Sequence, residues 1–108
     1  MRDFLETYPH GSNRAAFAPA ASDHTDARVL AAGVAEAHTV PAGARYVVFS
    51  ATADFYAKFG GAASVPGADV TDGTASSLNP TQRRIPDGVT TIGLIAPAAC
   101  TVTVSFWG

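Results

Sequence analysis

Hydrophobic and polar residues alternate through residues 45–59, within the stretch ARYVVFSATADFYAKFGG. The apolar phase of this run is Val47, Phe49, Ala51, Ala53, Phe55, Ala57 and Phe59. A period of two predicts β-strand with one buried face. Because the run exceeds the ~5–6 residues of an ordinary strand, we expect two consecutive strands, or one bent strand that serves two sheets.

The C-terminal stretch shows the same pattern on both sides of a turn of small residues. The apolar positions are Val89, Ile92, Leu94 and Ile95 before the turn, and Val102, Val104 and Phe106 after it. We expect a hairpin-like pair of strands joined by residues 96–99, APAA. Cys100, the single cysteine, lies among small and β-branched residues and is expected to be a buried free thiol.

The region that follows residue 27 also favours strand. Residues 34–40 predict a strand that ends at Pro41. Residues 28–33 stay undecided, because their alanines favour helix whereas Gly33 interrupts one.

Residues 60–88 are rich in turn signals, with short strands expected at ASV (63–65) or RRI (83–85). Taken with the alternating runs, this pattern predicts an all-β fold. The expected architecture is a small β-sandwich or a jelly-roll-like barrel with an extended N-terminal arm.

The expected arm covers residues 1–27 and the β-domain covers residues 28–108. Residues 1–27 carry no sustained periodicity, and a disordered tail is the alternative interpretation. In an arm, isolated apolar side chains would anchor the chain on another protein. These candidate contacts are Phe4, Leu5, Tyr8 and Phe17.

Composition limits the classes of partner. The chain of 108 residues is 47% hydrophobic and 15% charged, whereas about 25% is typical for the charged share. So few charges indicate either a surface rich in Ala, Thr, Ser and Gly or a surface that a partner partly covers, and we favour the second. The net charge of −2 and the scattered basic residues do not favour nucleic acid. No apolar run reaches the ~20 residues of a membrane span, and no apolar signal core is recognised, so we expect neither membrane insertion nor export.

Residues that could carry chemistry do not form a recognised motif. The histidines are His10, His24 and His38. They lie on separate segments without metal-ligand spacing, and ADVTDGT lacks the spacing and final glutamate of a calcium loop. Glu36 and Asp54 are interpreted as solvated charges on outward strand positions. We therefore expect no enzyme, no cofactor and no metal site.

Three aromatic residues fall on the phase opposite to the apolar one, namely Tyr46, Tyr56 and Trp107. Outward aromatic rings form either a platform that stacks on carbohydrate or an interface with protein. We favour the interface and nominate these three for contact between copies of the chain. Arg83 and Arg84 are the adjacent basic pair and are nominated for contact with an acidic patch of a partner.

The ordered series VPAGA, FSATADFY, LNPT and IAPAA, within residues 37–108, carries a family resemblance. The chain resembles small proteins encoded in the structural gene clusters of tailed bacteriophages. This resemblance implies a capsid decoration or cement protein, a small β-rich domain that is commonly trimeric and whose terminal arm lies along neighbouring capsid subunits. It implies the major capsid protein as partner, a homo-oligomer with a trimer favoured, and a place in the virion after assembly in the host cytoplasm.

Two other functions stay open at this point. One is a neck, tail or fibre-associated domain of the same kind of particle. The other is a carbohydrate-binding module, which would present Tyr46, Tyr56 and Trp107 as coplanar, exposed rings on one face.

Overall fold

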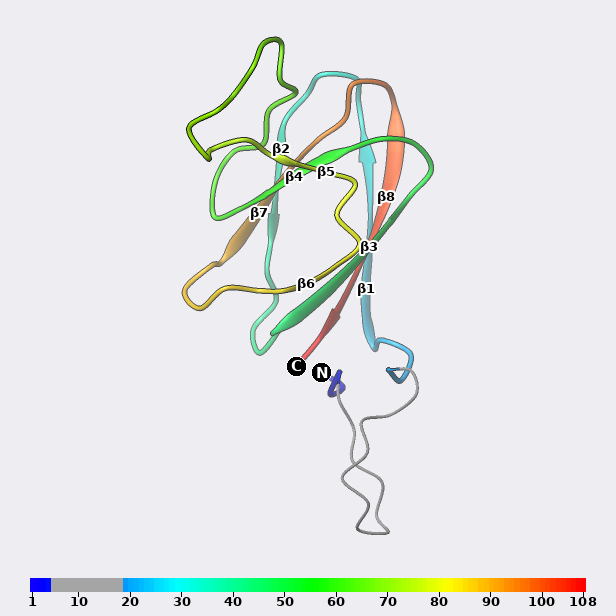
Figure 1. Cartoon of the computed structure of the whole chain (residues 1–108). Coiled ribbons are helices and arrows are strands. Elements are labelled where there is room, and N and C mark those ends of the chain that lie inside the picture. Colours follow the sequence, from blue (N-terminus) through cyan, green and yellow to red (C-terminus); the bar gives the residue numbers. More distant parts are fainter. Residues whose placement is uncertain (5–18) are drawn as a thin grey trace, which may run out of the picture.

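The computed structural model describes residues 1–4 and 19–108, which form an all-β domain (Figure 1). The strands are β1 (His24–Leu30), β2 (Glu36–Thr39), β3 (Tyr46–Ala51), β4 (Tyr56–Phe59), β5 (Ser77–Leu78), β6 (Gln82–Arg84), β7 (Thr91–Ile95) and β8 (Cys100–Trp107). In the described part of the chain, no helix is long and apolar enough to cross a membrane.

The strands form two four-stranded antiparallel sheets that pack as a sandwich. The first sheet has the order β1-β8-β3-β6 and the second has the order β2-β7-β4-β5. Most strands that follow one another in the chain lie in different sheets, so the chain passes repeatedly between the two layers (Figure 1). This order is that of a jelly roll. The predicted all-β sandwich is confirmed.

The core lies between the sheets and consists of the alternating apolar positions. Its largest fully buried side chains are Phe106, Leu30, Ile92, Leu94, Val47, Val102 and Val104. Phe49 packs against Phe55 and Phe59, with ring centroids 5.6 Å and 6.2 Å apart. Cys100 is a buried free thiol, as predicted. Burial of this apolar surface is the main favourable contribution to folding.

The long alternating run divides into β3 and β4, which lie in different sheets. The chain crosses between the layers at residues 52–55, where Thr52 N donates to the Thr101 carbonyl at 3.0 Å. The expectation of two consecutive strands is confirmed. The buried phase of Val47 and Phe49 resumes at Phe55 and Ala57, whereas Ala51 and Ala53, which were predicted to share it, are exposed at the break.

The predicted hairpin at residues 96–99 is wrong. β7 lies between β2 and β4, and β8 lies between β1 and β3, so the two strands do not pair. Residues 96–99 instead connect the two sheets. Ala96 is fully buried, and its carbonyl accepts a hydrogen bond from Gly33 N at 2.7 Å. The apolar side chains of β7 and β8 therefore face each other across the core.

The remaining elements differ from prediction at their boundaries. β1 begins at His24, inside the segment predicted to be an arm. It ends at Leu30, so residues 28–30 of the undecided stretch form strand. β2 lies within the predicted 34–40 strand. The RRI piece is observed one residue earlier, as β6, whereas residues 63–65 form no strand and β5 was not predicted.

Candidate functional site

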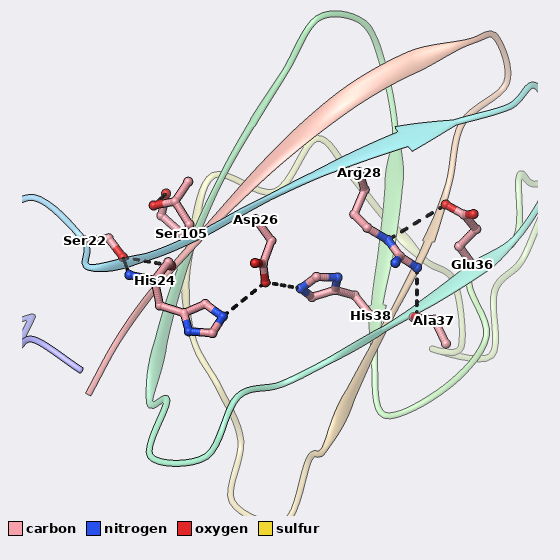
Figure 2. Close-up of polar contacts among 9 residues, drawn as sticks. Ser22, His24, Asp26, Arg28, Glu36, Ala37, His38 and Ser105 are labelled. Carbon is pink, nitrogen blue, oxygen red and sulfur yellow. Dashed lines mark hydrogen bonds and ion pairs between the residues drawn. The ribbon is translucent and has the colours of Figure 1, made fainter.

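The edge of the sandwich where β1 and β2 lie carries a row of polar side chains (Figure 2). β1 is the edge strand of the first sheet and β2 is the edge strand of the second. His24, Asp26 and Arg28 pair with the core residues Phe106, Val104 and Val102 of β8. Opposed residues of an antiparallel pair point to the same face, so these three polar side chains lie on the core side of β1.

One carboxylate oxygen joins two imidazoles across this edge. Asp26 Oδ2 lies 2.9 Å from His38 Nε2 and 3.3 Å from His24 Nε2. We refer to these three residues as the His–Asp–His cluster. His38 is 8% exposed, and its ring stacks on Phe106 with centroids 5.7 Å apart and planes 5° apart. A carboxylate accepts hydrogen bonds, so both imidazoles donate from Nε2.

A second polar link lies beside the cluster. The guanidinium of Arg28 donates from Nη2 to the Ala37 carbonyl at 3.0 Å, and its Nε lies 3.9 Å from Glu36 Oε2. Glu36 pairs with the core residue Leu94, so its side chain is on the core-side phase at the edge of the sandwich. Asp54 lies in the loop before β4, where it accepts a hydrogen bond from Asn79 Nδ2 at 2.8 Å. The prediction that both carboxylates occupy outward strand positions is wrong.

The cluster forms a polar link between the edge strands of the two sheets. Beside the cluster, Ser22 Oγ shares its single hydrogen between two backbone carbonyls, with the Phe106 oxygen at 2.6 Å and the His24 oxygen at 2.9 Å. Within residues 1–4 and 19–108, no three His, Cys, Asp or Glu side chains are placed to hold a metal ion. Inward-pointing charges on an edge strand also discourage pairing with other chains.

The sequence carries a signal for this edge that the apolar alternation alone does not reveal. Residues 24–28 and 36–38 place polar side chains at alternate positions, HTDAR and EAH, with small residues between them. That pattern is typical of edge strands whose core-side phase is polar. It identifies neither strand's neighbour, so the meeting of Asp26 with His38 is decided by the fold.

The predicted aromatic contacts divide between the two sheets. Tyr46 and Trp107 are register partners on the outer face of the first sheet. Tyr56 lies on the outer face of the second sheet, because its neighbour Ala57 pairs with the core residue Leu94. The coplanar three-ring platform that a carbohydrate-binding module would present is therefore absent.

Phe4 covers the Tyr46–Trp107 pair within the same chain. Its ring stacks on Tyr46 at 4.8 Å and meets Trp107 edge-on at 5.4 Å, and Phe4 and Trp107 are only 8% and 6% exposed. Trp107 Nε1 also donates to the Ala20 carbonyl at 2.8 Å. Phe4 is thus buried on its own domain. Leu5, Tyr8 and Phe17 lie outside the described residues.

The two arginines lie on β6 at the free edge of the first sheet, and both are exposed. Arg84 pairs with Tyr46 and shares its outer phase, whereas Arg83 pairs with the core residue Val47. The two side chains therefore emerge on opposite phases of the strand. Neither forms an ion pair with another described residue.

The outer faces of the two sheets differ. The first sheet presents Thr25, Ala27 and Val29 from β1, Thr101, Thr103 and Ser105 from β8, and Val48 and Ser50 from β3. We name this uncharged surface the open face; Val29 is 76% exposed there. On the second sheet, residues 61–63 cross over Gly93, and Lys58 Nζ donates to the Thr74 carbonyl at 3.0 Å. The loop between β4 and β5 therefore covers part of that sheet.

No protein family, curated protein or solved structure was found to match this chain.

Proposed function

We propose that this protein is a structural protein of a tailed-bacteriophage virion that decorates the capsid and stabilises it. The observation that carries the proposal is the open face. Three neighbouring strands of a small domain present side chains that are uncharged and mostly small or β-branched. Depletion of charged residues is the feature that distinguishes the core of a protein interface from ordinary surface.

The jelly-roll fold is compatible with this role and does not by itself define it. Further support comes from the low share of charged residues, 15%, and from the resemblance carried by residues 37–108. The partner in this proposal is the major capsid protein. A decoration protein binds only the assembled shell, so each bound copy makes the shell more stable by mass action.

The proposal includes a homo-oligomer, with a trimer favoured. Trp107 and Phe4 are already buried within the chain, so they leave the open face, Tyr56 and the arginines of β6 as surfaces for contact. Contacts by Leu5, Tyr8 and Phe17 stay part of the proposal. Their test must leave Phe4 in place, since deletion of residues 1–20 would also uncover Trp107.

The test is co-sedimentation with shells of the parent phage from which the protein has been removed. The variant Ala27→Glu places a carboxylate on the open face, opposite Thr103 of β8. Burying an unpaired charge costs several kcal/mol, so we expect occupancy to fall at least about tenfold. Ala68→Glu makes the same change on the β4–β5 loop, where Ala68 is exposed, and should bind as the wild type does.

Equal binding of the two glutamate variants would show that the open face does not contact the shell. A folded wild-type protein that fails to bind shells at all would overturn the decoration role. Binding of the same protein to purified necks or tails would then favour the other virion role.

A further inference from the structure

The N-terminal residues contact the domain at the end of β8. We name residues 1–4 the N-terminal strap, and the residues that hold it, Asp23, Tyr46, Trp107 and Gly108, the strap site. Gly108 N donates to the Arg2 carbonyl at 2.8 Å, and Phe4 N donates to the Gly108 carbonyl at 3.3 Å. The strap thus lies beside the end of β8, just past His24, where β1 begins (Figure 1).

Two further contacts fasten the strap. Arg2 N donates to Asp23 Oδ1 at 3.0 Å, and the N-terminal ammonium lies 3.9 Å from Asp23 Oδ2. The Phe4 ring occupies the aromatic part of the site against Tyr46 and Trp107. All of these contacts join the strap to the strap site directly.

The length of chain between the strap and the domain exceeds what the connection requires. Residues 5–18 separate Phe4 from residue 19, and Phe4 and Ala20 both contact Trp107. At ~3.3–3.6 Å per residue, these 14 residues reach about 46–50 Å when extended. A strap on such a link has the reach to dock on an adjacent molecule.

We propose that the strap site also accepts the strap of a second copy of this chain, so that neighbouring copies exchange their N-termini. The same contacts form in either arrangement, and exchange of an identical element is a low-cost route to oligomers. A short tether keeps a bound group at an effective concentration of about 1 mM near its own site. Exchange therefore requires copies that are held close together or a protein concentration near that value. Such exchange does not depend on the proposed function.

The single tryptophan of the chain allows a direct test. The acceptor is full-length, ¹⁵N-labelled Phe4→Ala, whose weakened strap leaves the site open and whose indole Nε1–H signal reports Trp107 alone. The donor is unlabelled, full-length Trp107→Phe, which keeps Phe4 and carries no tryptophan. We expect the donor to shift the indole signal progressively toward its wild-type position as its concentration is raised to about 1 mM and beyond.

The matched control is a donor that carries both Trp107→Phe and Phe4→Ala, which should leave the indole signal in place. If the intact donor moves the signal no further than this control does up to about 2 mM, the strap binds only its own chain and the proposal is wrong. Phe4→Leu serves as the acceptor if circular dichroism shows that Phe4→Ala is unfolded. Binding of the Phe4→Ala acceptor to shells is measured separately. This measurement distinguishes a failure of strap exchange from a failure of the open face to contact the shell.

Discussion

Asp26 on β1 accepts a hydrogen bond from His38 on β2 at 2.9 Å, and this bond joins the edge strands of the two sheets (Figure 2). His38 is 8% exposed, and its Nδ1 is buried without a partner among the described residues. The bond to Asp26 therefore supplies the only hydrogen bond of this ring within that part of the chain.

Asp26→Ala should destabilise the domain. The substitution leaves both ring nitrogens of His38 unpaired, and a buried polar group without a partner costs about 1–3 kcal/mol. Urea denaturation measures the loss. Asp69→Ala, which removes an exposed loop carboxylate, should stay within about 0.5 kcal/mol of the wild type. Equal stability of the two variants would mean that the cluster contributes nothing to folding.

Gly93→Ala should also destabilise the protein, because residues 61–63 cross directly over β7. A Cβ at position 93 would lie 2.3 Å from the Gly61 carbonyl oxygen and 2.6 Å from Ala63 N. Since both atoms belong to the backbone, the loop has to shift, and such overpacking costs about 1–3 kcal/mol. Thermal denaturation measures the effect. At Gly67 a Cβ meets nothing within 4 Å, so Gly67→Ala should be neutral or slightly stabilising.

Acid should weaken the attachment of the N-terminal strap. The hydrogen bond from Arg2 N holds the pKa of Asp23 below its ordinary value of 3.8, and the nearby N-terminal ammonium acts in the same direction. A lowered folded-state pKa gives stability that is present above the ordinary pKa and is lost as the pH falls through the folded-state pKa. Trp107 fluorescence should therefore shift to the red below about pH 3.8. In Asp23→Asn this step should disappear; its persistence would assign it to another group.

Cys100 should not react with a thiol reagent in the native protein. The residue is 5% exposed at the start of β8, and its Sγ lies 3.7 Å from the Ala53 carbonyl. We expect no reaction with Ellman's reagent until denaturant is added, and then one thiol per chain. Ala75→Cys, on the exposed β4–β5 loop, should react at once and serves as the positive control. Fast reaction of the wild type would show that the β7–β8 connection opens readily.

Much of the secondary structure was predictable because it depends on local alternation. The apolar phase of residues 45–59 placed Val47, Phe49 and Phe55 in the core, and the structure buries all three. Boundaries were less accurate where polar residues occupy the core-side phase. Residues 24–27, the first half of β1, were assigned to the arm for this reason, since His24 and Asp26 interrupt the expected apolar pattern.

The sequence by itself determined the strands in which apolar and polar residues alternate, and their apolar phase, because side chains alternate between faces at every residue. Only the tertiary structure decided which strands are neighbours. The APAA segment suits a hairpin as well as a connection between sheets, and burial of both β7 and β8 in one core selects the connection. The same packing brings Asp26 to His38 and Phe4 to Trp107, contacts between residues far apart in the chain that no local pattern encodes.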